Sequence, residues 1–415
     1  MASHGYGALT VCLFVQLVLT AGVSLRGASR VIETVSRVLG LGLAVPHWTC
    51  GRLWVLRLGH AKLTADKPPA EDWAWLVDHS VQIGQEKCLV TLGVRLCDLP
   101  PRGQCLRQQD MELIDLVPGK SWTAARVEAS LEKAAAAGHV PRVIVDDHGG
   151  DLHGGVERFR RRHPHTAEIY DIKHKAACLL RKLLEDDPRW RAFTGSVGQS
   201  RCEVQQTELA YLTPPAPKLK ARFMNLGGQL AWARRVLAIL RQSPSGGRLQ
   251  QKLGWVADFE GELAEWSQWQ QVIDVAVKWV NTRGIYRGVS TQLKRQLAQL
   301  SGLAQSAREL ATRLCDFVAA QESQARPGER LAGSTEILES CFGKFKHLEK
   351  QQSRGGFTQL LLGLGAQLAR LTPQSVGDML RSSRTKDVRQ WARQNLGTTL
   401  FAQRKLAFAS ATKSG

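Results

Sequence analysis

The sequence is short of acidic residues relative to basic ones. Its 415 residues include 56 Lys and Arg but only 37 Asp and Glu, which gives a formal net charge of +19 and an isoelectric point of about 9.9. This surplus favours a polyanionic partner, nucleic acid ahead of a membrane surface, although charge bears on non-specific binding rather than on chemistry. Hydrophobic residues make up 43% of the chain, so most of it should fold.

Paired cysteines and long apolar runs are also lacking. The nine cysteines are an odd number without any Cys-x-x-Cys spacing, which indicates reduced thiols and supports neither a disulfide framework nor a zinc site. The apolar run Ala8–Leu19 is shorter than the ~20 residues that span a bilayer, and no Lys or Arg precedes it. We therefore expect a buried helix there, no membrane segment and a cytoplasmic protein.

Three widespread catalytic motifs are missing. The sequence contains no complete Gly-x-x-x-x-Gly-Lys-Ser/Thr phosphate loop, no Gly-x-Ser-x-Gly nucleophile elbow and no metalloprotease His-Glu-x-x-His. Its chemistry must therefore be sought in other residues.

Residues 1–62 show helical patterns with a basic bias. Up to His60 they contain five Arg, one Glu and no Lys or Asp, and Ser24 offers a capping side chain before a helical segment. Short helices joined by a turn, with basic residues, are typical of a helix-turn-helix module, in which Arg26 and Arg30 would contact DNA. The alternative is a small helical cap that packs on the next domain.

Residues 70–185 alternate between strand and helix patterns. We expect strands at 73–77, 87–94, 111–116, 142–145 and 167–170, and helices at 121–137, 152–162 and 174–184. This order predicts an α/β domain whose sheet contains strands of mixed direction.

The strand patterns fade after this domain. From 186 to 331 the abundance of Leu, Ala, Gln and Trp predicts an all-helical insertion. A helix that begins near Ser334 belongs to a segment, 332–370, that completes the α/β domain, and a basic helical tail occupies 371–415.

Three acidic residues stand where such a fold would gather metal ligands. Asp78 and Asp147 each follow a predicted strand, and Glu339 lies on the late helix. Adjacent strands can bring two such ends together and a helix across the sheet can add the third carboxylate, so that the three hold two divalent ions about 3.5–4 Å apart. Oxygen ligands suit Mg²⁺ or Mn²⁺. In such a site one ion activates water or a 3′-hydroxyl and the other stabilises the leaving oxygen.

A lysine on the same helix strengthens this interpretation. Lys346 follows Glu339 by seven residues (346 − 339 = 7), so both lie on one helix face, and the Lys can contact a phosphate at the metals. Two neighbours compete for the ligand roles: Asp146 with Asp147, and Glu336 with Glu339. We prefer Asp147 because it directly precedes a His-Gly-Gly turn, and Glu339 because of its spacing to Lys346.

These blocks resemble the catalytic motifs of bacterial insertion-sequence transposases of the DDE superfamily. The resemblance extends over about residues 24–370, and its specific stretches are Val77–Gly84, Val145–Leu152 and Glu339–Lys346.

The resemblance implies a ribonuclease-H-like catalytic domain. It makes Asp78 the first metal ligand, Asp147 the second and Glu339 the third, with Lys346 as the phosphate-contacting base and two Mg²⁺ or Mn²⁺ ions as cofactors. The wide gap between the last two ligands (339 − 147 = 192) implies a helical insertion before the catalytic helix, which the composition indicates independently.

Two further elements have both a functional and a structural interpretation. Asp171 and His174 match a Cys/Asp-x-x-His element that follows the second aspartate in several transposase groups, where they would support the metal site. The alternative is a strand-to-helix junction with a surface His. The arginines at 158 and 160–162 fit a phosphate-binding surface or a solvated helix end.

The insertion is rich in tryptophan. Trp255 is a candidate for stacking on an unpaired or flipped base. Trp266, Trp269 and Trp279 fit a helix core by their spacing. Lys344 on the late helix is a further candidate DNA contact.

Together these features predict a DNA transposase. The N-terminal module binds the element ends, the carboxylates cut them, and a 3′-hydroxyl attacks the target DNA. We expect a homodimer on paired ends in a bacterial cytoplasm, associated with the nucleoid. Two alternatives are a non-enzymatic DNA-binding protein, descended from a decayed or domesticated transposase, and a ribonuclease-H-like nuclease without strand transfer.

Overall fold

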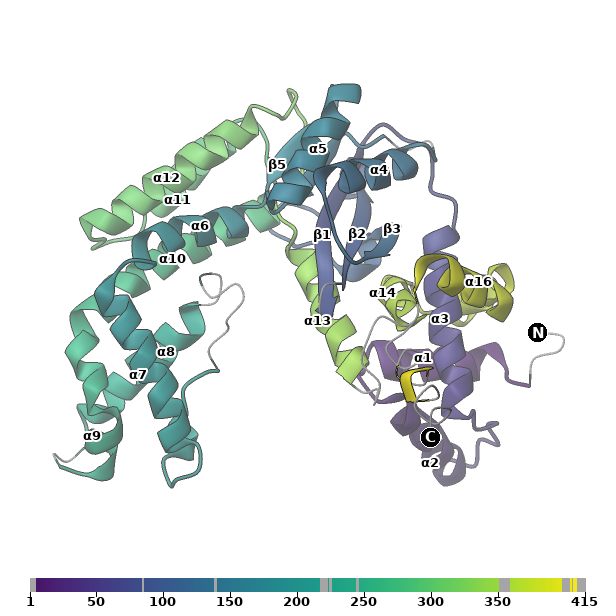
Figure 1. Cartoon of the computed structure of the whole chain (residues 1–415), viewed down its shortest axis with the longest axis horizontal. Coiled ribbons are helices and arrows are strands. Elements are labelled where there is room, and N and C mark those ends of the chain that lie inside the picture. The colour runs from purple at the N-terminus through teal and green to yellow at the C-terminus, as the bar shows by residue number, and fades with distance from the viewer. Residues whose placement is uncertain are drawn as a thin grey trace. The chain divides into compact units, whose positions relative to one another are not determined.

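The computed structural model describes residues 5–83, 86–137, 140–216, 223, 226–243, 246–350, 359–397, 404 and 406–408. The chain forms two compact units. The first comprises Met1–Glu168 and Thr335–Gly415, and the second comprises Ile169–Ser334. Figure 1 shows the elements of both.

A five-stranded mixed sheet is the centre of the first unit. Its order is β3-β2-β1-β4-β5, so β1 is an inner strand with a partner on each side. β1 is antiparallel to β2 and parallel to β4, and β2 is antiparallel to β3. The strands are β1 (Trp73–Ile83), β2 (Glu86–Arg95), β3 (Glu112–Gly119), β4 (Val143–Asp146) and β5 (Ala167–Tyr170). All five expected strands are present, and the expected mixed α/β sheet is confirmed.

Helices α4 (Ala124–Ala135) and α5 (Gly150–Arg162) cover one face of this sheet. Alternate residues of a strand point to opposite faces, so Trp73, Trp75 and Val77 point to the same one. They share a buried core with apolar side chains of the two helices. Burial of these large side chains is the main stabilising contribution on this face.

Helix α13 (Glu336–Lys350) contacts β1 as well. Because β1 is paired along both edges and α4 and α5 cover one face, α13 must pack on the other face. Ala74, Leu76 and Asp78 point to that face by strand alternation. The helix carrying Glu339 and the strand carrying Asp78 are therefore in direct contact (Figure 1).

The N-terminal helices pack against the C-terminal ones within the first unit. The N-terminal helices are α1 (Ala8–Leu19), α2 (Leu25–Val38) and α3 (Trp48–Thr64), and the C-terminal ones are α14 (Leu362–Gln367), α15 (Pro373–Ser382) and α16 (Thr385–Asn395). α3 contacts all three C-terminal helices, α1 contacts α15, and α2 packs on α1 and α3. Ser24 caps α2 by accepting a hydrogen bond from the Gly27 N–H. The Arg57 guanidinium of α3 is buried and donates to the carbonyls of Ser383 and Leu380. Among the described residues up to 62, α1, α2 and α3 are helical as expected, and α3 is built into this unit.

The second unit is helical in the residues that the structure describes. Its helices are α6 (Ile172–Leu184), α7 (Pro188–Val204), α8 (Leu226–Leu240), α9 (Arg248–Leu253), α10 (Glu260–Arg283), α11 (Val289–Leu297) and α12 (Gln305–Glu322). An isolated β-bridge joins Ile285 to Leu331. Trp266 and Trp269 of α10 are buried, as their spacing predicts. Across both units, none of the described helices has the length and apolar character needed to cross a membrane.

One expected boundary is wrong. The sequence pattern places Asp78 at the end of a strand, whereas β1 continues to Ile83. The continuous apolar run stops at Val77, but the antiparallel pairing with β2 extends beyond it, with a register shift between Ser80 and Ile83. Of the expected basic tail at 371–415, residues 398–403, 405 and 409–415 lie outside the described part of the chain.

Helices α3 and α14 approach closely at Gly59, which gives a testable prediction. A Cβ atom on Gly59 would lie 1.7 Å from the Leu362 carbonyl oxygen, so the backbones would have to move apart. We expect Gly59→Ala to lower the free energy of unfolding by about 3 kcal/mol, as overpacking of a core does. Urea denaturation of the full chain measures this.

The matched control is Gly343→Ala on α13. Gly343 is exposed, and its added Cβ would meet nothing within 4 Å. Ala favours a helix over Gly, so this variant should be more stable by about 0.5–1 kcal/mol. Equal stability of Gly59→Ala and the wild type would show that the helices do not approach closely at this point.

Candidate active site

The parallel pairing of β1 and β4 aligns the two predicted aspartates. Leu76 lies opposite Val145, an offset of 69 residues (145 − 76 = 69). The same offset aligns Asp78 with Asp147 (78 + 69 = 147), one residue beyond the end of β4. Neighbouring strands lie about 4.7–4.9 Å apart. Both half-buried carboxylates therefore belong to the same edge of the sheet, where β4 ends.

Side-chain hydrogen bonds hold the turn between β4 and α5. Asp146 Oδ1 accepts the N–H of His148 at 2.6 Å, and Asp147 Oδ1 accepts the N–H of Gly149 at 2.8 Å. Such bonds from an Asp to the backbone two residues on are a common way to fix a turn. His148 has a φ of +55°, a left-handed conformation that is strained for a residue with a side chain. The turn is thus held in an unfavourable backbone conformation by its surroundings.

Asp146 and Asp147 face different neighbours. Asp146 is completely buried and within hydrogen-bond reach of Glu168 on β5. The Asp147 carboxylate is half-buried, and its charge acts on His79 of β1. Asp147 therefore lies toward the strand that carries Asp78, and Asp146 lies toward the opposite neighbour of β4.

His79 adds an acid–histidine pair beside these aspartates. Its Nε2 atom lies 2.9 Å from Asp151 Oδ2 in the first turn of α5. Burial lowers the pKa of the His79 imidazole, against the opposing effect of the Asp151 carboxylate. At neutral pH a neutral His79 therefore donates its Nε2 proton to Asp151.

The two candidate glutamates both lie in the first turn of α13. Glu336 and Glu339 are half-buried, so exposure does not distinguish them. Lys346 is exposed two turns after Glu339. Lys344 is also exposed, and its Nζ donates to Gln108 Oε1 at 2.8 Å.

The predicted ligands do not form a closely spaced group in this structure. Among the described residues, the side chains of Asp78, Asp147 and Glu339 do not all bring their ligand atoms within 4.8 Å of one another. A pair of ions about 3.5–4 Å apart lets ligands of different ions lie farther apart than that. Convergence of the three carboxylates on a metal pair therefore stays a prediction.

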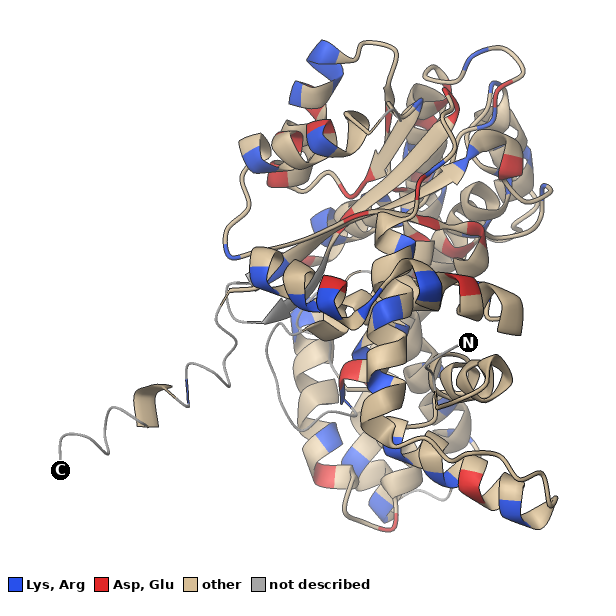
Figure 2. Ribbon diagram, turned by 90° about the vertical axis from the view of Figure 1, so that its right-hand side faces the viewer, with Lys and Arg blue, Asp and Glu red and all other residues tan. Residues whose placement is uncertain are grey.

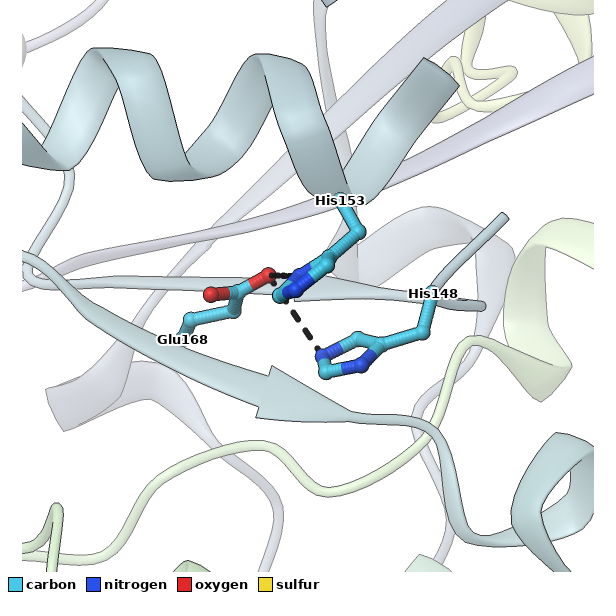
Figure 3. A group of neighbouring side chains, drawn as sticks. All are labelled: His148, His153 and Glu168. Atoms are coloured by element: carbon cyan, nitrogen blue, oxygen red, sulfur yellow. Dashed lines mark hydrogen bonds and ion pairs between the residues drawn. The ribbon is translucent and has the colours of Figure 1, made fainter. Parts of the chain in front are cut away.

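A second cluster, which the sequence patterns did not single out, lies on the α5 side of β4 and β5. His148, His153 and Glu168 have ligand atoms that all lie within 4.8 Å of one another. Glu168 Oε1 is 2.6 Å from His153 Nδ1 and 3.4 Å from His148 Nε2 (Figure 3). Burial, and then the charge of Glu168, raise the pKa of the adjacent Asp146 carboxyl well above its ordinary value.

This cluster has a weak signal in the sequence. Residues 145–154 contain three Asp and two His in ten positions. Glu168 gives no such signal, because it follows fourteen residues later within a short strand. Only the pairing of β5 beside β4 brings it to the two histidines.

The predicted supporting residues Asp171 and His174 belong to the second unit. Asp171 is buried at the N-terminus of α6, and its Oδ1 accepts the N–H of His174 at 2.9 Å. The structure thus shows the capping role of Asp171. Support of a metal site by either residue stays a prediction.

Trp255 packs among other aromatic rings of the second unit. It is half-buried, and its Nε1 donates to Ser200 Oγ at 2.8 Å. Its ring centroid lies 5.9 Å from that of Phe193 and 5.8 Å from that of Phe259. Stacking on a base would require the indole to leave this cluster.

The basic candidates differ in their surroundings. Arg26 and Arg30 on α2 are exposed, and the Arg26 guanidinium lies 5.2 Å from the centroid of the Trp48 ring. Arg160 instead donates to Glu168 Oε2 at 3.0 Å, and Arg162 pairs with Glu128 at 3.3 Å. The arginine run at the end of α5 is therefore engaged in ion pairs within the protein.

Comparison with known proteins gives little further guidance. No protein-family model matches the chain, and no curated protein matches it. Among solved structures, the chain is similar to a strand transfer complex of the Drosophila P element transposase, with 10% sequence identity and a TM-score of 0.39, over 88% of this chain and 92% of that one. A likeness at this level establishes neither a shared fold nor a shared activity.

The role of Asp171 can be tested by substitution. If it acts as a helix cap, Asp171→Ala should lower the free energy of unfolding by about 1 kcal/mol, and Asp171→Asn, which also caps well, should restore most of it. Thermal unfolding of the full chain measures both. An Asn variant as unstable as the Ala variant would show that the negative charge, rather than the cap, is required.

Proposed function

We propose that this chain is a DNA transposase of the DDE type, with a ribonuclease-H-like catalytic domain. The observation that carries the proposal is the β1–β4 register, which aligns Asp78 with Asp147 at the edge where β4 ends. The five-stranded mixed sheet with helices on its faces is compatible with that fold. Contact of α13 with β1 supports a third carboxylate from that helix.

The donor atoms of this site fit divalent metal ions. Asp78, Asp147 and Glu339 offer only carboxylate oxygens, which Mg²⁺ and Mn²⁺ prefer. The ions would supply charge stabilisation for phosphoryl transfer and would activate the attacking hydroxyl. The three carboxylates hold the ions, and Glu336 is the alternative third ligand on the same helical turn.

Other residues of the chain would position DNA at the carboxylates. Lys346, exposed on α13, contacts the phosphate next to the cleaved bond. Arg26, Arg30 and Lys344 bind the backbone of the element ends. The formal charge of +19 suits a DNA partner. Figure 2 marks the positions of Lys and Arg along the ribbon. Action as a homodimer on paired ends is part of this proposal.

Replacement of Asp147 tests the catalytic assignment. Asp147→Asn keeps the shape of the side chain but removes a negative ligand. We expect cleavage of DNA in Mg²⁺ to fall by at least about 100-fold, because loss of several kcal/mol of charge stabilisation has that effect. DNA binding, measured by fluorescence anisotropy, should remain unchanged or become slightly tighter.

The control and the competing outcomes use related variants. Asp66→Asn, an exposed aspartate of the same unit, should cleave as the wild type does. Full activity of Asp147→Asn would remove this residue from the mechanism. Cleavage by the wild type without joining of precut ends to target DNA would favour a nuclease instead, and binding without metal-dependent cleavage would favour a non-enzymatic DNA-binding protein.

Point substitutions test the proposed DNA-binding role of α2 better than a deletion does. Removal of residues 1–62 would take away α3, whose Arg57 and Gly59 are packed in the first unit. The double variant Arg26→Gln, Arg30→Gln should bind DNA more weakly and reduce the slope of log K against log salt by about 2, since each lost phosphate contact contributes about 0.9.

The matched control for this experiment is Arg181→Gln, Arg248→Gln. Both arginines are exposed, and each pairs with a glutamate of its own unit. This variant should keep the salt slope of the wild type. An unchanged slope in the α2 variant as well would mean that α2 does not contact DNA phosphates.

A further inference from the structure

The cluster on the α5 side of the sheet joins three successive elements. His148 lies in the turn after β4, His153 on α5 and Glu168 on β5, and the two imidazole rings stack with centroids 4.1 Å apart. Figure 3 shows both rings directed at the same carboxylate. The Glu168 side chain is 5% exposed, whereas those of His148 and His153 are 27% and 37% exposed. The cluster is thus closed on its acidic side and open to solvent at its histidines.

A buried carboxylate oxygen borders this group without a partner. Asp146 is 0% exposed, and its Oδ2 atom has no hydrogen-bond partner among the described residues. The Asp146 carboxyl is within hydrogen-bond reach of Glu168, yet two ionised carboxylates only accept hydrogen bonds.

The ligand atoms of His148, His153 and Glu168 lie close together, and the other contacts of these residues are compatible with a bound ion. Arg160 donates to Glu168 Oε2 at 3.0 Å, which leaves Oε1 for the histidines. His153 Nδ1 lies on the side of Glu168 and would be the ligand atom. Its other ring nitrogen, Nε2, lies 3.7 Å from Glu157 Oε1. A carboxylate behind a histidine is the usual arrangement around a metal ligand, because it fixes the ring and raises its basicity.

We propose that His148, His153 and Glu168, beside the buried Asp146 carboxyl, bind a divalent transition-metal ion such as Zn²⁺. Two imidazoles and carboxylate oxygens suit this class of ion better than Mg²⁺, for which oxygen ligands are preferred. Zn–N and Zn–O distances of about 2.0–2.2 Å place neighbouring tetrahedral ligands roughly 3.3 Å apart. The contact of 3.4 Å between His148 and Glu168 already matches, whereas the 2.6 Å contact of His153 must open on binding.

This site is separate from the proposed active site and serves a different purpose. His148 is the residue between Asp147 and Gly149 in the strained turn. An ion bound to His148, His153 and Glu168 would fasten that turn to α5 and β5. It would thereby position Asp147 without contacting DNA.

Zinc binding by the full-length protein tests the proposal directly. Exposed thiols are alkylated first, because Cys97, Cys105, Cys178 and Cys202 can also bind zinc. The metal-free protein is then titrated with ZnCl₂ in competition with a chromophoric chelator, and the zinc retained after dialysis is measured by mass spectrometry. The wild type should hold one zinc equivalent that His153→Gln lacks, and loss of this ligand should weaken binding by at least about 100-fold.

Two controls separate this site from other sources of zinc. His163→Gln removes an imidazole that lies 3.1 Å from Glu132, a His–Glu pair of the same kind outside the cluster, and should keep the zinc equivalent. The double variant Asp78→Asn, Asp147→Asn should keep it too. A protein that binds zinc here but does not cut DNA would contradict the transposase proposal and leave this one intact.

A second variant guards against misfolding. If His153→Gln does not fold, His148→Gln, in a turn, removes a different ligand. Zinc should raise the melting temperature of the wild type and not that of either variant. Wild-type zinc affinity in both variants would overturn the proposal, and the cluster would then be a hydrogen-bonded network only.

Discussion

The parallel pairing of β1 with β4 is the constraint on which the candidate site depends. β1 is an inner strand that is antiparallel to one neighbour and parallel to the other, so it runs in the same direction as β4 but not as β2. The tryptophans of β1 hold α4 and α5 against one face, and α13 packs on the other. A shift of this register by one residue would direct Asp78 to the opposite face and break both layers. Core packing and the placement of the acidic residues are therefore set by the same pairing.

The buried acidic residues near the end of β4, Asp146 and Glu168, do not stabilise the fold. Burial of Asp146 and Glu168 side by side removes two carboxyl groups from water. Arg160 and the two histidines contact Glu168, but desolvation of both carboxyl groups still lowers the stability of the fold. The strained backbone at His148 adds a cost of roughly 1–3 kcal/mol. Apolar residues of similar size would fill the space with less loss of stability. Groups kept at such a cost point to chemistry or metal binding at the end of β4.

The sequence predicted the strands and helices around the sheet because each has a regular pattern with a clear boundary. The helices expected at 121–137 and 174–184 are present as Ala124–Ala135 and Ile172–Leu184, and the five segments expected to be extended are strands. The extent of β1 was missed because its last residues are held by pairing with β2 rather than by an apolar run. Glu168 was missed for a similar reason, since the pairing of distant segments leaves no trace in local spacing. Trp255, a candidate for base stacking in the sequence, is half-buried and packs against Phe193.

The neighbouring residues Asp146 and Asp147 have different surroundings in the structure. Asp146 and Asp147 point to opposite faces of the sheet by strand alternation; Glu168 acts on the Asp146 carboxyl, and the Asp147 charge acts on His79. In the two proposals, this one turn contributes to two groups of ligands. A carboxylate-only set beside β1 suits hard ions that exchange with substrate, and a set with two histidines beside β5 suits an ion that stays bound. The proposed ion at His148, His153 and Glu168 would restrain the turn between β4 and α5. The Asp147 carboxylate in that turn would then keep its orientation when DNA and catalytic metal ions bind beside β1.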